Sequence, residues 1–180
     1  MVPEAPLEQD ELGGVRPVGD GWFVVNLRDT RWFEIEGGDR FTVFDSEEAR
    51  FDQVGIGVGI VRPGDPNAMY HAEDAQDDFL VLSGECLLIV EGQERLLKQW
   101  DFVHCTPMTE HVFVGAGDRP CVVVGVGARR KGRALLYPVN ETALKHGAGV
   151  EEETTDPAAA YARFPEAKRI PCPDELPDLD

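Results

Sequence analysis

Two histidines and a glutamate near the middle of the chain have the residue types and the spacing of a metal site. His71 and Glu73 are two residues apart in a segment predicted to be extended, and alternate residues of a strand project from the same face. His111 precedes the short apolar run 112–114 and is the candidate third donor, from a neighbouring strand. Two imidazoles and one carboxylate on one face form a donor set that first-row transition metals accept, with positions left for water or substrate.

These residues resemble the two sequence motifs of the cupin superfamily. The family's first motif, G-x5-H-x-H-x3,4-E-x6-G, corresponds here to Gly64, six residues, His71, Ala72, Glu73, three residues, Asp77, six residues and Gly84. The second motif, G-x5-P-x-G-x2-H-x3-N, corresponds to Trp100, six residues, Pro107, Met108, Thr109, Glu110, His111, three residues and Gly115. Carried over by position, the resemblance implies four metal ligands, with Glu73 and Asp77 replacing a histidine and a glutamate of the family: His71, Glu73, Asp77 and His111.

The resemblance implies an all-β fold, an antiparallel double-stranded β-helix or jelly-roll barrel, that receives a small-molecule ligand or substrate. The two-histidine, one-carboxylate set favours Fe(II), while Mn, Ni, Zn and Cu stay open. With coordination positions free, we predict a metal-dependent dioxygenase-type oxidoreductase, with isomerase or decarboxylase chemistry behind it. The same residue order is also similar to the triad of 2-oxoglutarate-dependent oxygenases, for which Arg119 is the nearby basic candidate.

Two other functions suit the same residues, one without catalysis and one without a metal. In the first, the barrel is a non-catalytic module that binds a sugar or another small molecule. In the second, His71 acts as general base and a carboxylate orients it, as in a metal-free isomerase or epimerase. Nothing in the residues separates catalysis from binding.

Three further residues are candidates for lining the cavity or supporting the ligands. Met69 and Phe113 have the same strand parity as His71 and His111, so they project toward the same side, although barrel core is an equally good interpretation. His104 adds a third imidazole near the second motif, and a histidine hydrogen-bonded between strands is the simpler interpretation.

Short apolar segments separated by glycine-rich turns must position these side chains. Many short strands at regular spacing predict an antiparallel barrel independently of any family. The strand candidates are 21–26, 31–35, 41–44, 54–61, 79–82, 86–90, 95–97, 101–105, 112–114 and 121–126. In the segment 54–61 glycine alternates with Val and Ile, so one face is nearly bare and either admits another strand or leaves room in a cavity.

The composition divides the chain into three parts. Residues 1–20 are rich in Pro, Gly and acids and predict a flexible arm; residues 21–128 form the barrel with its N-terminal strands, and 54–127 carry the motifs. Residues 129–180 predict an extension with short helices at 141–146 and 158–163 and an acidic tail that lies on the surface or is mobile. The basic cluster 129–133 can meet an anionic substrate, but a solvated turn is the favoured interpretation.

The charge and the cysteines bound the partners. With 34 acidic against 17 basic residues, the formal net charge is −17, which argues against nucleic acid and anionic membranes. The four cysteines form no C-x-x-C pair and the N-terminus has no signal-peptide pattern, so we predict a cytoplasmic protein without disulfides. Strands that a lone barrel leaves with open edges predict a homodimer, with Trp22 and Trp32 as interface or core anchors.

Overall fold

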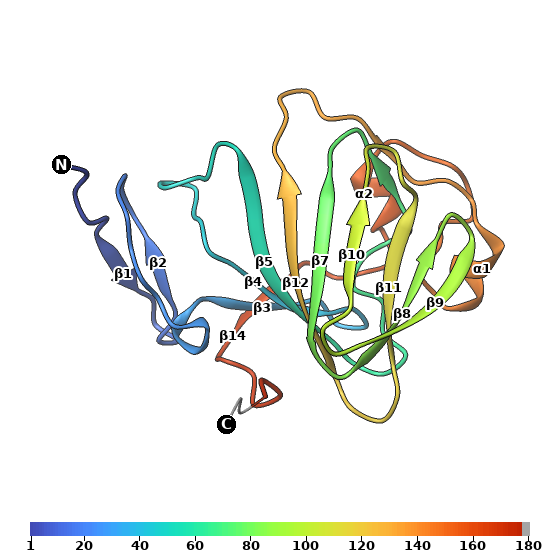
Figure 1. The fold of residues 1–180 in the computed structure, drawn as a ribbon, viewed down its shortest axis with the longest axis horizontal. Helices are drawn as coiled ribbons and strands as arrows, with labels where there is room; N and C mark the ends of the chain where they lie inside the picture. Colours follow the sequence, from blue (N-terminus) through green and yellow to red (C-terminus); the bar gives the residue numbers. More distant parts are fainter. Residues whose placement is uncertain (178–180) are drawn as a thin grey trace.

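Two antiparallel sheets face each other in the computed structural model, which describes residues 1–177 (Figure 1). The larger sheet has seven strands in the order β10 (Phe102–Cys105), β7 (Asp77–Ser83), β12 (Cys121–Ala128), β5 (Val54–Val61), β4 (Arg40–Val43), β3 (Trp32–Glu34) and β14 (Lys168–Ile170). The smaller sheet has three, in the order β11 (His111–Ala116), β8 (Glu85–Val90) and β9 (Gln93–Lys98). The predicted all-β, antiparallel, jelly-roll fold is confirmed.

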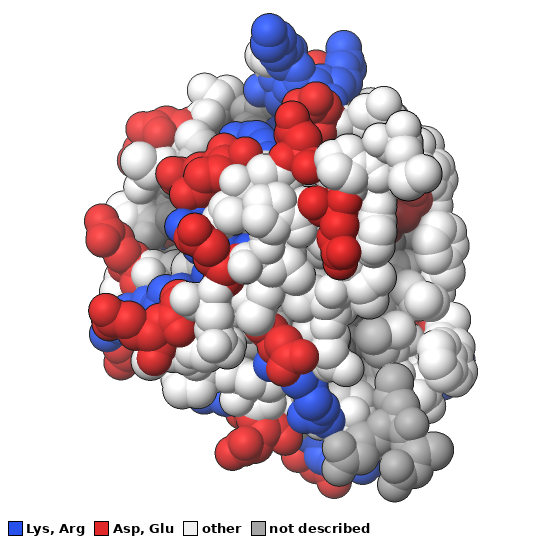
Figure 2. All heavy atoms as spheres, turned by 90° about the vertical axis from the view of Figure 1, so that its left-hand side faces the viewer, with Lys and Arg blue, Asp and Glu red and all other residues white. Residues whose placement is uncertain are grey.

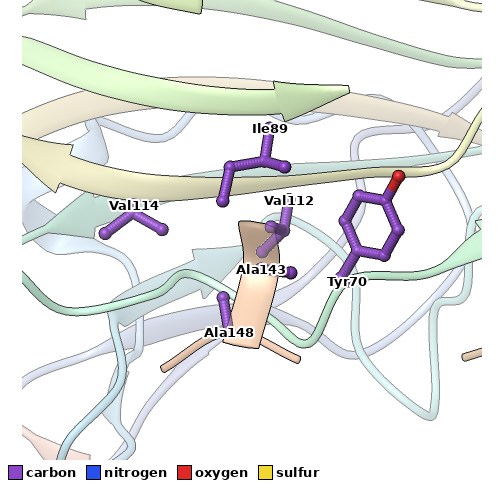
Figure 3. Packing of buried hydrophobic residues seen from close by; sticks show 6 residues of the cluster. All are labelled: Tyr70, Ile89, Val112, Val114, Ala143 and Ala148. Carbon is purple, nitrogen blue, oxygen red and sulfur yellow. The ribbon is translucent and has the colours of Figure 1, made fainter. Parts of the chain in front are cut away.

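Strand alternation decides which side chains enter the space between the sheets. Phe113 on β11 packs inward against Val81, Leu88 and Val123, where Phe79 and Val103 adjoin the same cluster. The neighbouring residues Val112 and Val114 point the other way, onto the outer face of the smaller sheet. There they pack with Tyr70, Ile89, Ala143 and Ala148, as Figure 3 shows. The inner face of β11 is therefore available to His111, which has the parity of Phe113.

Two short strands and two short helices complete the part of the fold that follows the first motif. β6 (Ala72–Glu73) pairs with β13 (Leu135–Leu136), which lies beyond the last barrel strand. α1 (Glu141–Lys145) and α2 (Pro157–Ala160) begin after the predicted caps, since the side chains of Asn140 and Asp156 accept hydrogen bonds from Ala143 and Ala158 backbone N–H groups. α1 lies on the side of the smaller sheet, and its Ala143 packs with Ile89 and Val112 (Figure 1).

The two ends of the chain are more structured than the sequence analysis anticipated. Within residues 1–20, β1 (Leu7–Gln9) and β2 (Val15–Pro17) form a hairpin. Near the other end, β14 pairs with β3, and Leu176 packs with Trp32 and Ile60 on the outer face of the larger sheet. The tail therefore covers core residues rather than lying free, up to residue 177; residues 178–180 lie outside the described part of the chain.

The strand expected at 21–26 is not formed. Trp22 makes only an isolated bridge with Glu4 and is 53% exposed, whereas Trp32 is fully buried. Asn26 instead accepts a hydrogen bond from the Arg28 backbone N–H and begins a 3-10 helix, Leu27–Asp29. A side chain that bonds the backbone two residues ahead favours a turn over a strand, which is why the extended segment ends there.

Hydrophobic helices, cysteines and surface charge bear on the possible partners of the protein. No helix within residues 1–177 is long and apolar enough to cross a membrane. The four cysteines are free thiols. On the face shown in Figure 2, acidic side chains are spread across the surface and not gathered in one patch, which is typical of a solvated surface.

Candidate metal centre

His71 and His111 lie directly opposite each other. Each backbone N–H donates to the other residue's carbonyl, with N–O distances of 3.2 Å from His71 and 2.8 Å from His111. Residues opposed in this way project from the same face, and the two imidazole centroids are 4.9 Å apart. The pairing of the two motifs thus places both rings side by side inside the barrel, where His111 is 3% exposed.

A backbone carbonyl fixes the orientation of each ring. Nδ1 of His71 is 2.8 Å from the Met69 oxygen, and Nδ1 of His111 is 3.0 Å from the Thr109 oxygen. Because a carbonyl only accepts, Nδ1 carries the proton in both rings and Nε2 keeps its lone pair. Burial lowers the pKa of His71 to about 4, with His111 as a further cause, and burial also lowers the pKa of His111. Both rings are therefore neutral at pH 7.

Glu73 and Asp77 form a hydrogen-bonded carboxyl pair beside the histidines. Glu73 on β6 is 5% exposed, and Asp77 begins β7 opposite Gly127, whose missing Cβ leaves room for the Asp77 side chain. Burial raises the pKa of Glu73 to about 7, with the Asp77 charge and hydrogen bond as further causes, and burial also raises the pKa of Asp77. The two carboxyl groups thus hold a proton between them more readily than exposed carboxylates do.

Arg133, which the sequence motifs do not include, joins the site. Its Nη1 atom is 2.8 Å from Oε2 and 3.1 Å from Oε1 of Glu73. The reason is the β6–β13 pairing, in which Leu135 lies opposite Glu73 and brings the preceding residues over the first motif. The only sequence signal was the basic cluster 129–133, for which a solvated turn was favoured. We call residues 129–137 the strap.

The strap is fixed to the first motif at three further points. The Ala134 backbone N–H donates to the Asp74 carboxylate, and Arg130 lies 3.6 Å from the same side chain. The Tyr137 ring centroid is 5.9 Å from that of His71. These contacts hold the strap against the first motif, while the Phe79 ring centroid is 5.4 Å from that of His111.

The three supporting candidates have different positions. Phe113 is 1% exposed and adjoins both His111 and Phe79, with ring distances of 6.5 Å and 4.7 Å. The Met69 side chain packs away from the barrel in a cluster with Tyr137, and only its carbonyl serves the site. His104 points to the outer face, where its Nδ1 is 2.6 Å from Asp78 and its side chain is 49% exposed. Alternation along β10 places it there, so it does not reach the histidine pair.

The donor types at the centre fit a first-row divalent metal, and both histidines have the tautomer that ligation through Nε2 requires. The donor side chains, as positioned, do not complete the coordination shell of an ion. Among residues 1–177, no three His, Cys, Asp or Glu side chains converge as ligands of one ion, and Glu73 faces Arg133. An ion at the histidines must therefore draw the Glu73 carboxylate away from a guanidinium. Arg119, with its side chain 85% exposed beside Asp118, does not supply a buried basic group.

Comparison with known proteins supports the fold. Residues 57–127 match the cupin domain family, and no curated protein matches the chain. An RmlC-like cupin from Shewanella frigidimarina NCIMB 400 is 15% identical, with 62% of this chain and 95% of that chain covered and a TM-score of 0.53. A putative sugar phosphate isomerase from Acidithiobacillus ferrooxidans ATCC 23270 is 18% identical, with 80% and 83% covered and a TM-score of 0.50.

A third solved structure, a sugar phosphate isomerase of the cupin superfamily from Silicibacter pomeroyi DSS-3, is 22% identical, with a TM-score of 0.49. The match covers 54% of this chain and 64% of that protein, less than two thirds of its length. At these identities the likenesses show the fold alone. The family match identifies residues 57–127 as a cupin domain, and the two structures with TM-scores of 0.53 and 0.50 agree with it in fold.

Proposed function

We propose that this cupin is a metal-dependent enzyme that acts on a small molecule, with His71, Glu73, Asp77 and His111 as ligands of a divalent transition metal. The observation that carries the proposal is the pair of buried neutral imidazoles, each held by a carbonyl so that Nε2 is free to ligate. Fe(II) is favoured by the two-histidine, carboxylate donor set, and Mn, Ni, Zn and Cu suit the same donors.

The residues around the centre have separate tasks in this proposal. The Met69 and Thr109 carbonyls orient the two imidazoles. The rings of Phe79 and Phe113 exclude water on one side. A bound metal would supply Lewis-acid polarisation of a substrate oxygen. Glu73 and Asp77, which share a hydrogen bond in the metal-free protein, would release that proton on ligating the ion.

Elemental analysis of protein loaded with a first-row metal and then desalted tests the proposal directly. We expect close to one equivalent of a first-row metal per chain after exposure to the metal and desalting. Less than about a tenth of an equivalent of every metal tried would reject the metal site. Isothermal titration of chelator-treated protein then ranks Fe(II), Mn(II), Ni(II), Zn(II) and Cu(II) by affinity.

For the reaction, we propose the dioxygenase-type oxidation expected from the donor set. Fe(II)-loaded protein should consume oxygen with at least one member of a panel of catechols, flavonols, thiols and 1,3-diketones. Uptake no faster than that of free Fe(II) across the whole panel would remove the oxygenase branch. It would not affect the metal site itself.

A second candidate function, metal-free isomerisation or epimerisation, is favoured by the Glu73–Arg133 ion pair. That pair gives the first-motif carboxylate a cationic partner within the chain, and the free Nε2 of His71 is then available as general base. Activity on a phosphorylated or free sugar that survives complete removal of metal would select this function. Activity that disappears with the metal and returns with it would reject it.

Removing the guanidinium from the strap should strengthen metal binding. Arg133→Gln leaves Glu73, whose side chain is 5% exposed, without its ion-pair partner, so the carboxylate can turn to the ion without breaking that pair. We expect the affinity of chelator-treated protein for Zn(II) to rise about tenfold. Arg130→Gln, on the same strap but paired with Asp74, is the matched control and should change the affinity less than twofold. An unchanged or weaker affinity in Arg133→Gln would show that Arg133 does not compete with the ion.

A further inference from the structure

A cavity of about 420 Å³ lies on the inner face of the larger sheet, next to the histidine centre but separate from it. Its wall includes Gly57, Gly59 and Gly125, at positions where β5 and β12 pair, so the bare face of the glycine-alternating strand leaves space there. None of the four predicted metal ligands lines it. Phe79 lines it on one side and contacts His111 on the other, so this ring separates the two sites.

Asp39 lines this cavity and has no cationic partner. The residue is 8% exposed, and its own backbone N–H is the only hydrogen-bond donor to its carboxylate among residues 1–177. The nearest cation is Arg62, but that guanidinium binds Asp65 at 3.0 Å, Glu34 at 3.2 Å and the Gly38 carbonyl at 3.3 Å. The Asp39 carboxylate instead leans over Gly59, where an added Cβ would lie 3.2 Å from Oδ2.

Burying a carboxylate without a partner is unfavourable for the folded protein. Burial raises the pKa of Asp39 to about 7, against weaker lowering influences from its own backbone N–H and Arg62. Carboxyl groups perturbed in this way, at the edge of a cavity, are typical of binding sites, where a ligand supplies the missing partner.

The rest of the lining indicates the charge of that ligand. Apart from Asp39, no charged residue within the described chain lines the cavity, so it offers an anion no positive group. Three rings line it, those of Phe41, Phe79 and Tyr161, and aromatic faces attract cations. The formal net charge of −17 favours the approach of a cation as well.

We propose that this cavity binds a small organic cation, an amine on an apolar body, whose ammonium group pairs with Asp39 while the body lies against Phe41 and Phe79. The volume accommodates a single aromatic ring with a short side chain. This site requires no metal at the histidine centre, so it is independent of the proposed reaction.

Isothermal titration of chelator-treated protein at pH 8 tests this inference with three probes of one shape. Phenethylamine is the cation, phenethyl alcohol the neutral analogue and phenylacetate the anion. We expect phenethylamine to bind at least tenfold more tightly than the alcohol, and phenylacetate not to bind. Asp39→Asn should weaken phenethylamine binding at least tenfold and leave the alcohol within twofold. The control Glu36→Gln removes an exposed carboxylate from the same turn and should change nothing.

The pH dependence gives a second readout. Arg62 and Tyr161 are the charged and titratable groups that face Asp39; a guanidinium keeps its charge, and burial raises the pKa of Tyr161 to about 12, so neither changes between pH 6 and 8. Phenethylamine affinity should therefore fall about tenfold from pH 8 to pH 6, as Asp39 takes up a proton.

Four results would overturn the inference: equal affinity for the amine and the alcohol, binding of phenylacetate, an Asp39→Asn variant that binds the amine like the wild type, or no binding of any probe at millimolar concentration. Equal binding of the neutral alcohol would indicate that Asp39 serves as a protonated hydrogen-bond donor. His111→Ala should bind phenethylamine as the wild type does, so failure of the metal proposal and failure of this one are distinguishable.

Discussion

Replacing His111 by alanine is expected to weaken binding of a divalent metal by more than about 100-fold. The substitution removes one of the two Nε2 lone pairs at the centre, and the remaining imidazole then has only the carboxyl pair as further donors. Glu73 of that pair is engaged with Arg133, so the pair replaces the lost ligand poorly. The measurement is a competition titration of chelator-treated protein with Zn(II) and a chromophoric chelator.

His104→Ala is the matched control for this experiment. His104 is a histidine of the same chain region, but its side chain is on the outer face and bound to Asp78. Its removal should change the metal affinity less than twofold. Metal affinity within threefold of the wild type in His111→Ala, with the fold intact by circular dichroism, would exclude the proposed centre. Loss in both variants would point to nonspecific binding by histidines.

The sequence predicted those parts of the molecule that depend on local alternation. The inward direction of Phe113 follows from strand parity, whereas Asp77 was predicted from the spacing of the family motif; the structure places Asp77 beside Glu73 and Asp78 beside His104. The opposition of His71 and His111 was expected from the spacing of two motifs. Their role as ligands stays a prediction, because position alone does not show that an ion is bound.

What the sequence did not predict depends on contacts between distant segments. Arg133 reaches Glu73 because β13 pairs with β6, and both strands are only two residues long, too short for a periodic signal. Asp39 follows a glycine turn and has the pattern of an exposed loop acid. It is buried because the chain near Tyr161, more than a hundred residues later, packs over the same cavity. A short window of sequence does not predict burial or strand pairing that depends on segments so far apart.

Asp39→Asn is expected to stabilise the protein at pH 8, by on the order of 4 kcal/mol in the free energy of unfolding. The unfolded carboxyl titrates near 3.8, while burial raises the folded-state pKa to about 7. Between these values the folded protein holds a proton that the unfolded chain releases, so wild-type stability falls as pH rises through this window. Asparagine has nearly the same shape and does not titrate, so the variant escapes that loss.

Urea unfolding at pH 4.5 and at pH 8 measures the effect. The variant and the wild type should be similar at pH 4.5, where Asp39 is protonated in the folded state, and should diverge at pH 8. Glu36→Gln should stay within about 0.5 kcal/mol of the wild type at both values, as exposed substitutions do. A variant less stable than the wild type at pH 8 would mean that the carboxylate already has a partner.

Saturating phenethylamine should narrow the difference in stability between the variant and the wild type at pH 8, because the ligand stabilises only the protein that keeps Asp39. Asp39 would then lower stability without a ligand and restore it when a cation binds. Its presence would be explained by binding and not by folding.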